Sequence, residues 1–435
     1  MHPNALLEAC TELVGQVLQF EHPADSVVSH YFRGNRTLGQ RERATLAETV
    51  YTVLRKKLLF DAFAQSAPKG AGPKARRLAI LGFYGPRDFV RSVLNDSEKQ
   101  WLDACDAAVA AGLKDGFMDL HRHNLPDWLV QPLKEQLGAP DFWKLVESLS
   151  QTAPLDLRVN ELKAKRADAS AELKKFAIKS VATPFSPWGL RIEGKPALNK
   201  LDLFINGLVE VQDEGSQLLA LLLDAKRGEM VVDFCAGAGG KTLAIGASMR
   251  NTGRLYAFDT AAHRLDALKP RLARSGLSNV HPAAIAHERD ERIKRLAGKI
   301  DRVLVDAPCT GLGTLRRNPD LKWRQSAAGV AEMAVKQAAI LQSAARLLKP
   351  GGRLVYATCS LLRAENEEIA LAFTAANRDF SPLAAEQILS NLKVQGAASL
   401  CSGPGRDGSL DDAYLRLWPH RHATDGFFAA IWQKQ

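Results

Sequence analysis

Three acids and two cysteines stand where short apolar runs of the sequence give way to loops. Each run is rich in β-branched or aromatic residues, as expected of a strand buried in a sheet. Because the carboxyl ends of parallel strands meet at one edge of a sheet, we expect these side chains to line a single cleft. They are Asp233, Asp259, Asp306, Cys309 and Cys359.

The first acid leads into a glycine-rich turn, Asp233-Phe-Cys-Ala-Gly-Ala-Gly-Gly-Lys-Thr242. A strand, a tight turn and a helix start, in this order, present free backbone N–H groups to a ligand. The Gly-Lys-Thr ending is typical of phosphate-binding loops, but that frame needs glycine where Cys235 stands, and Asp233 would repel a triphosphate. Asp259 follows about 20 residues later, where a carboxylate can bind ribose hydroxyls. An adenosine-type ligand therefore fits better, with an ordinary strand–helix turn as the alternative.

The two late cysteines differ from the rest of the six in the chain. A lone cysteine is usually a small buried hydrophobe, which is how we interpret Cys10, Cys105 and Cys235. Cys309 and Cys359 instead lie on the expected ligand side, where a helix N-terminus or Lys241 could favour the thiolate. Such a pair could be a redox couple, a soft-metal site, or a nucleophile and base. Because no third cysteine or paired histidine accompanies them, we expect no metal.

The elements that must position these residues alternate between strand and helix. This alternation predicts an α/β fold with a doubly wound, mostly parallel sheet. The expected strands are residues 231–233, 255–259, 300–306, 353–357 and 427–432, and the expected helices are residues 243–249, 264–275 and 328–348.

The first half of the chain has a different character. Apolar residues recur at helical spacing in residues 6–18, 24–32 and 40–60, which predicts a helical domain. A strand over 154–160, a helix over 166–176 and a strand over 189–193 predict a small α/β domain. We therefore expect a helical domain at 1–135, a small α/β linking domain at 136–210 and the main domain at 211–435.

Length and charge limit the classes of protein to consider. A chain of 435 residues is too long for one core. Its formal net charge of +10 favours a polyanionic partner. Arg41 and Arg43 begin a basic face that could bind phosphates, although a solvated helix face is the simpler interpretation. The N-terminus shows no signal sequence and the apolar runs are too short to span a membrane, so we expect a cytoplasmic protein. We also expect a monomer.

Several motifs together resemble a known family. They are Asp306-Ala-Pro-Cys-Thr-Gly-Leu-Gly313, Arg316-Arg-Asn-Pro-Asp-Leu-Lys-Trp323, Ala357-Thr-Cys-Ser360, Gln212-Asp-Glu-Gly-Ser216 and the glycine turn. They are similar to those of the RNA cytosine-5 methyltransferases of the Fmu/Sun/Nop type, above all the bacterial members that act on small-subunit ribosomal RNA. The stretch Leu38-Gly-Gln-Arg-Glu-Arg43 and its helices resemble the NusB-like RNA-binding domain of those members. The resemblance implies a Rossmann-like class I methyltransferase domain with S-adenosylmethionine as cofactor.

The resemblance also implies roles for individual residues. Cys359 would attack carbon 6 of cytosine, and Cys309 would help remove the carbon-5 proton so that Cys359 can leave. Asp306 would bind the cytosine edge, and Lys241 matches an active-site lysine. The implied cofactor-binding residues are Cys235, Ala236, Gly237, Ala238, Gly239, Gly240, Lys241, Asp259, Arg264 and Asp306. We expect the two sulfurs to meet beside the methyl donor, with room between them for a flipped base.

Two departures from the family pattern stand out. The turn reads Gly237-Ala-Gly-Gly-Lys241 where members usually have Ala-Pro-Gly-Gly-Lys, and residues 285–290 lack the usual Gly-Asp, with His287 near that position. The adenine contact therefore stays unassigned. Two alternatives remain: a non-catalytic RNA-binding assembly factor, and a DNA cytosine-5 methyltransferase in which Cys309 is the nucleophile.

Overall fold

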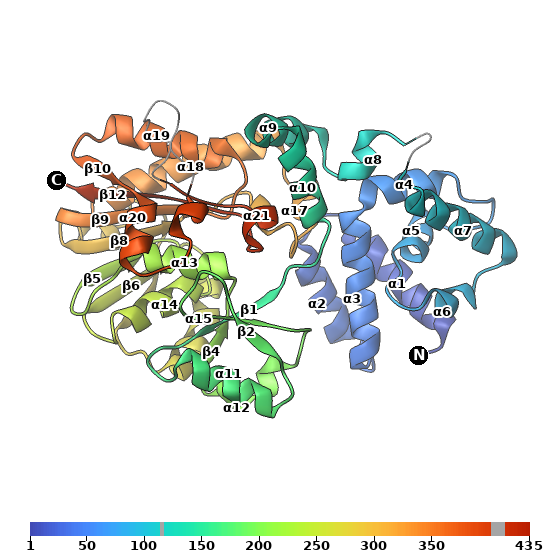
Figure 1. Ribbon diagram of the computed structural model, residues 1–435, viewed down its shortest axis with the longest axis horizontal. Helices are drawn as coiled ribbons and strands as arrows, with labels where there is room; N and C mark the ends of the chain where they lie inside the picture. Colours follow the sequence, from blue (N-terminus) through green and yellow to red (C-terminus); the bar gives the residue numbers. More distant parts are fainter. Residues whose placement is uncertain (114–116, 402–413) are drawn as a thin grey trace. The chain divides into compact units, whose positions relative to one another are not determined.

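The computed structural model describes residues 1–113, 117–401 and 414–435. The chain forms two compact units, and the second begins where the helices of the first give way to strands (Figure 1). The helical unit comprises Met1–Thr152 and Leu315–Ala327, and the α/β unit comprises Ala153–Thr314 and Ala328–Gln435. Within the described ranges, no helix combines the length and the apolar character needed to cross a bilayer.

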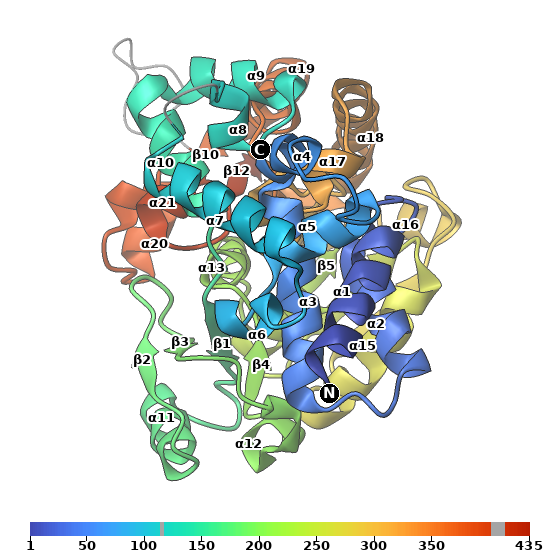
Figure 2. The same cartoon turned by 90° about the vertical axis from the view of Figure 1, so that its right-hand side faces the viewer.

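Three helices form the centre of the helical unit. Helices α1 (Pro3–Val17), α3 (Gln40–Arg55) and α5 (Lys74–Gly82) pack against one another (Figure 2). Gly82 permits the close approach of α5 to α3, because a Cβ at this position would lie 2.6 Å from the Val53 side chain. The remaining helices before residue 150 are α2 (Ala24–Gly34), α4 (Lys57–Gln65), α6 (Arg87–Arg91), α7 (Asp96–Ala110), α8 (Asp119–His123), α9 (Asp127–Leu137) and α10 (Ala139–Leu149).

The expected helix over residues 40–60 is two helices. The backbone at Lys56 leaves the helical region, with φ −112° and ψ 26°, and so separates α3 from α4. The apolar spacing continues across this break because Leu59 and Phe60 join the same core as Val53 and Leu54. Periodicity alone therefore could not reveal the boundary.

A late segment of the chain belongs to the helical unit. Residues 315–327 contain the short helix α17 (Leu321–Arg324). The Trp323 indole N–H donates to the Leu54 carbonyl at 2.8 Å, and the Asp320 carboxylate accepts from the Ala24 N–H at 3.2 Å. These bonds fasten the segment to α3 and to the start of α2.

The second unit contains a small antiparallel sheet with strand order β2-β3-β1-β4. Its strands are β1 (Leu155–Val159), β2 (Ser180–Ala182), β3 (Gly189–Ile192) and β4 (Val209–Val211). Helix α11 (Arg166–Lys175) covers one face through Ala169 and Leu173. This arrangement contains the predicted strand, helix and strand. The 3₁₀ turn η1 (Leu198–Lys200) and helix α12 (Asp202–Ile205) complete this region.

The main sheet has the order β10-β12-β9-β8-β5-β6-β7, and β11 pairs with β12. Strands β5 to β9 are parallel to one another, whereas β12 pairs antiparallel with β9, β10 and β11. The predicted doubly wound, mostly parallel sheet is confirmed. The strands are β5 (Met230–Asp233), β6 (Arg254–Asp259), β7 (Val280–Ala284), β8 (Ile300–Asp306), β9 (Leu348–Thr358), β10 (Phe380–Leu383), β11 (Leu415–Leu417) and β12 (Phe427–Lys434).

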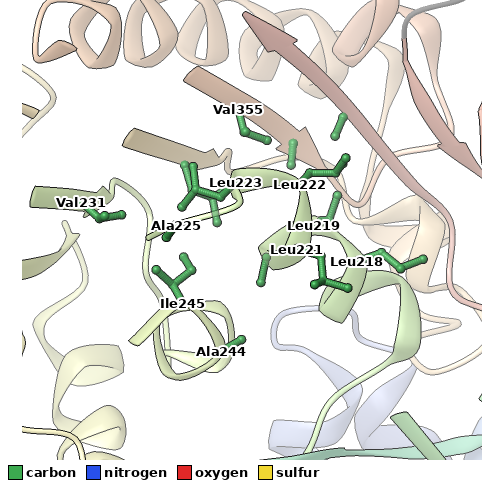
Figure 3. Packing of buried hydrophobic residues seen from close by; sticks show 14 of the residues in the cluster. Leu218, Leu219, Leu221, Leu222, Leu223, Ala225, Val231, Ala244, Ile245 and Val355 are labelled. Carbon is green, nitrogen blue, oxygen red and sulfur yellow. The ribbon is translucent and has the colours of Figure 1, made fainter. Parts of the chain in front are cut away.

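Helices cover both faces of this sheet (Figure 1). On one face the leucines of α13 pack against Val231, Ile245 and Val355, as Figure 3 shows. On the other face α18 and α19 pack against the alternate residues of the same strands, such as Val232 and Tyr356. The helices of this unit are α13 (Glu214–Leu223), α14 (Gly240–Ser248), α15 (Ala262–Ser275), α16 (Glu291–Lys294), α18 (Ala327–Ala345), α19 (Glu367–Ala376), α20 (Ala385–Asn391) and α21 (Pro419–His422), with 3₁₀ turns η2 (Leu312–Thr314), η3 (Arg363–Glu365) and η4 (Ala397–Leu400).

Candidate active site

The glycine turn joins the end of β5 to the start of α14. Gly239 adopts φ +82°, and a Cβ there would lie 2.1 Å from the Leu268 side chain, so glycine is required for both conformation and space. Gly237 also has positive φ, but a Cβ there would meet nothing within 4 Å. The turn therefore has an open side at Gly237 where a ligand can approach the backbone.

Asp233 lies beneath this turn and is fully buried. One carboxylate oxygen accepts from the Thr242 hydroxyl at 2.7 Å, whereas the other has no hydrogen-bond partner among the described residues. Burial is the main cause that raises the pKa of Asp233 to about 7. The carboxyl therefore exchanges its proton near neutral pH at the base of the proposed cofactor loop.

Asp259 fixes the turn from the neighbouring strand. Its carboxylate accepts from the Gly237 N–H at 2.8 Å and from the Ala261 N–H at 2.7 Å. The Ile285 N–H donates to the Asp259 carbonyl at 3.0 Å, so the end of β7 lies alongside. Asp259 therefore stands at the expected strand end, and each of its carboxylate oxygens accepts from one backbone N–H group.

Lys241 and Asp306 form an ion pair at the centre of the site. The Lys241 ammonium lies 2.7 Å from the Asp306 carboxylate, and both side chains are mostly buried. Burial disfavours the ammonium, but Asp306, with Cys359 and Asp233 beyond it, outweighs this effect and raises the pKa of Lys241. The lysine therefore carries its positive charge beside both the acid and the thiol of Cys359.

The two cysteines that follow β8 and β9 are in contact. Their sulfurs lie 3.4 Å apart, and both side chains are half-buried. The hydrogen bond to Cys359, followed by burial, raises the pKa of Cys309 well above its usual range. Cys309 therefore keeps its proton while it contacts Cys359.

A glycine makes this convergence possible. Gly313 donates its N–H to the Cys359 carbonyl at 2.8 Å and accepts from the Gly426 N–H at 2.9 Å. A Cβ on Gly313 would lie 2.1 Å from the Gly426 oxygen and 2.7 Å from the Cys359 oxygen. Any larger residue would separate the loop of Cys309 from the loop of Cys359.

Glu365, fully buried, connects the two cysteine loops. Its carboxylate accepts from the Thr310 N–H at 2.8 Å, from the Thr310 hydroxyl at 2.5 Å and from the Ser360 hydroxyl. The Gln337 amide also donates to it at 3.0 Å and donates to the Pro308 carbonyl at 2.9 Å. One carboxylate therefore holds the residues that follow both cysteines.

Asn366 supports Cys359 on both sides. Its amide oxygen accepts from the Thr358 hydroxyl at 2.5 Å, and its amide nitrogen donates to the Ser360 carbonyl at 3.0 Å. Sequence reasoning missed both Glu365 and Asn366. The signal that could have found them is a run of four polar residues, Glu365-Asn-Glu-Glu368, so soon after the strand end that carries Cys359.

Comparison with known proteins decides the family. The family described as "16S rRNA methyltransferase RsmB/F" matches residues 220–433, and its "ferredoxin-like domain" matches residues 125–199. The chain is 31% identical to the probable ribosomal RNA small subunit methyltransferase B of Synechocystis sp., over 98% of this chain and 90% of that protein. The corresponding protein of Bacillus subtilis is 30% identical over 92% of each chain. The crystal structure of PH0851 superposes with a TM-score of 0.78 at 28% identity, covering 100% of this chain and 99% of that one.

The chain belongs to the RsmB/F family. It is an S-adenosylmethionine-dependent RNA methyltransferase, and the reaction is methylation of ribosomal RNA at cytosine carbon 5. The two cysteine-bearing strand ends that pointed to this RsmB/F chemistry in the sequence are those that the fold brings together.

The other sequence-derived site residues of this RsmB/F member occupy different surroundings. Burial raises the pKa of Cys235 well above its usual range, so this thiol remains protonated beneath the turn. Arg264 lies in the first turn of α15 with an exposed side chain. Arg271 of the same helix, which the sequence did not single out, donates to the Ala238 carbonyl at 2.6 Å and so contacts the glycine turn directly.

Two expectations need correction or completion. Sulfurs 3.4 Å apart leave no space for an aromatic ring, so a base must lie beside the cysteine pair and not between its members.

In the region without the family Gly-Asp, His287 is exposed, and Asp290 accepts from the Ala286 and Arg292 N–H groups at 3.0 and 2.9 Å. Asp290 therefore stabilises its own loop. Over the described part of the chain, no group of three or more His, Cys, Asp or Glu side chains could hold a metal ion.

Proposed function

We propose that this enzyme methylates a cytosine of small-subunit ribosomal RNA with Cys359 as nucleophile and Cys309 as the base that releases the product. The observation that carries the assignment is the asymmetry of the thiol pair: the contact with Cys359 and burial raise the pKa of Cys309, whereas Cys359 lies beside the Lys241 cation. A nucleophilic sulfur is activated by such a neighbouring cation.

The proposed reaction follows from this arrangement. The Cys359 thiolate forms a bond to carbon 6 of the cytosine, and the ring electrons shift so that carbon 5 becomes nucleophilic. S-adenosylmethionine, when bound, supplies the methyl group that carbon 5 accepts. Once Cys359 is bonded to carbon 6, it no longer raises the pKa of Cys309, which gives its proton to water and takes the proton from carbon 5. The bond between carbon 6 and sulfur then breaks and returns the Cys359 thiolate.

The remaining residues bind and orient. The open side of the turn at Gly237, the carboxylate of Asp259 and the unpartnered oxygen of Asp233 fit an adenosylated amino acid, which offers hydroxyl and ammonium donors. Asp306, held by Lys241, would accept hydrogen bonds from the amino edge of the cytosine. Arg264 stays a proposed contact of the adenosyl group.

We also propose a function for each domain of the chain. We assign RNA binding to the helical domain (1–135), with 136–210 as linking domain and 211–435 as methyltransferase domain. Arg41 is exposed at the start of α3, which suits a phosphate contact. We place the enzyme in the cytoplasm as a monomer, because its substrate class is found there and its sites are built from one chain.

Covalent trapping tests the cysteine roles. Cys309→Ala and Cys359→Ala variants are incubated with ribosomal RNA and methyl-labelled cofactor, then separated on denaturing gels. We expect Cys309→Ala to accumulate an RNA–protein adduct, because release is blocked, and Cys359→Ala to form none.

Other outcomes would select the alternatives. An adduct in Cys359→Ala but not in Cys309→Ala would make Cys309 the nucleophile, as in the DNA enzymes. Absence of labelling by the wild type on any RNA would favour a binding protein without turnover. Mapping 5-methylcytosine in RNA from cells with and without the protein would identify the position.

A further inference from the structure

The helical unit contains a cavity of about 190 Å³ whose polar lining is cationic. Its charged or titratable lining residues are Arg55, Lys56, His121, Arg122, His123 and Lys322. Leucines, including Leu59 and Leu149, form much of the remaining wall. The described residues that line the cavity include no carboxylate.

Lys322 is the most deeply placed of these cations. Its side chain is 6% exposed, and its ammonium donates to the Arg55 carbonyl at 3.0 Å and lies 4.9 Å from the centre of the Trp323 ring. Burial, with the neighbouring Arg55 charge, lowers the pKa of Lys322 to about 7. The sequence analysis gave this lysine no role beyond its place in a motif.

Arg55 lies beside it and is 8% exposed. Its guanidinium donates to the Arg316 carbonyl at 3.1 Å and lies 5.9 Å from the centre of the Tyr51 ring, whereas its Nε has no hydrogen-bond partner among the described residues. His123 is also buried, and burial lowers its pKa, with a contribution from Lys322. Two buried cations and a buried histidine therefore face the same cavity.

This arrangement costs folding free energy. Moving an ammonium out of water without a counter-charge is strongly unfavourable. In the other unit, the buried Arg416 lies 3.3 Å from the Glu367 carboxylate, and the half-buried Arg191 lies 2.7 Å from Asp156. A bound anion would supply the missing counter-charge for Lys322.

We propose that this cavity binds a phosphodiester group of the substrate RNA, with Lys322 and Arg55 at its floor and Lys56 at its rim. The inference rests on the proposed RNA-binding role of the helical unit and adds a defined contact to it. Phosphate contacts set the register of a nucleic acid on a protein. The leucine side chains of the walls can pack against the carbon atoms of the adjoining ribose.

The test uses the full-length enzyme and three variants. Lys322→Met and Lys56→Met remove cavity charges, and Lys69→Met removes an exposed charge of the same unit that does not line the cavity. RNA affinity is measured against salt concentration. We expect Lys322→Met to bind several-fold more weakly and to reduce the salt slope by about 0.7–0.9, the value for one phosphate. Lys56→Met should show a smaller decrease of the same kind, and Lys69→Met none.

Thermal unfolding of the free variants separates this role from a structural one. We expect Lys322→Met to unfold at the wild-type temperature or above, because the substitution removes an uncompensated buried charge. A lower unfolding temperature together with an unchanged salt slope in both cavity variants would overturn the proposal. Equal slope changes in Lys69→Met and Lys322→Met would also overturn it.

Inorganic phosphate distinguishes the source of the anion. If phosphate stabilises the wild type more than Lys322→Met while both bind RNA with the same salt slope, the cavity is a site for free phosphate and the RNA assignment fails. Methyl transfer at saturating RNA is measured in parallel. Absence of methyl transfer by the wild type would contradict the proposed function. Normal transfer, together with a salt slope of RNA binding that Lys322→Met leaves unchanged, would contradict this inference alone.

Discussion

Several buried or half-buried cations of the two units differ in whether an acid lies beside them. In the methyltransferase unit, Lys241 lies against Asp306, and Arg271 and Arg274 share the carboxylate of Glu210. In the helical unit, Lys322 and Arg55 line a cavity without an acid. Paired charges fix the geometry of a preformed site, whereas unpaired ones leave a position that a charged ligand can complete.

Breaking the central ion pair should have the largest effect. Lys241→Met removes the cation beside Cys359 and leaves the Asp306 carboxylate uncompensated, so we expect single-turnover methyl transfer to slow by about 10³-fold. Quench-flow with labelled cofactor measures this rate. Lys269→Met, which removes an exposed charge from α15, is the matched control. A rate within threefold of wild type would show that the pairing has no part in catalysis.

Glu365→Gln should have the next largest effect. The new amide group would face donors from Thr310, Ser360 and Gln337, so we expect a loss of about 3 kcal/mol in the free energy of unfolding. The rate of adduct formation in the Cys309→Ala background should fall by at least about tenfold, because Cys359 is no longer held in place. Cofactor affinity, measured by calorimetry, should stay unchanged, and this separates positioning from general damage. Glu368→Gln, exposed on α19, should leave all three quantities at wild-type values.

Asp233 is a buried acid of the methyltransferase unit, and its raised pKa predicts a pH dependence of stability. Its pKa is about 7 in the folded protein and about 3.9 when unfolded, so between these values only the folded state holds the proton. Raising the pH through this window therefore favours unfolding by about 1.4 kcal/mol per unit. Relative to Asp233→Asn, the wild type should lose about 2 kcal/mol between pH 5 and 6.5 in urea titrations. Parallel pH profiles for the two proteins would contradict the assignment, and Asp266→Asn serves as the exposed control.

Arg41 tests an exposed cation of the helical unit and should have the smallest effect. We expect Arg41→Ala to weaken RNA binding by about threefold and to lower the salt slope by less than about one. Arg43 differs, because its side chain donates to the Leu38 carbonyl at 3.0 Å and lies over the Phe32 ring. If Arg41→Ala binds RNA with the same affinity and salt dependence as the wild type, this basic face contacts water and not phosphate.

The main features of the site could be predicted from the sequence because each belongs to a strand end. A β-branched run followed by a glycine turn or by Pro-Cys is a local signal, and local signals placed Asp233, Asp306 and Cys309 correctly on one edge of the sheet. Strand β7 was missed because His281-Pro282 interrupts the apolar pattern of an outer strand. Glu365 could not be assigned because its partners, from Thr310 to Gln337, come together only in the folded chain.

The placement of residues 315–327 was equally hidden from sequence reasoning. Nothing near Trp323 indicates that its partner is Leu54, since the two are separated by most of the chain. The Lys322 cavity was hidden for the same reason, because its walls come from the N-terminal helices and from residues 315–327. Contacts between residues far apart in the chain produce no periodic pattern in the sequence.

The late return of this segment has a consequence for biosynthesis. As the chain leaves the ribosome, the N-terminal helices emerge first, but the indole that bonds to the Leu54 carbonyl follows only after residues 153–314 have been made. Until then the nascent helices expose an incomplete apolar surface, a state prone to association with other chains. An expression fragment that stops before residue 315 would preserve that immature state permanently, which makes the intact polypeptide the proper unit for production.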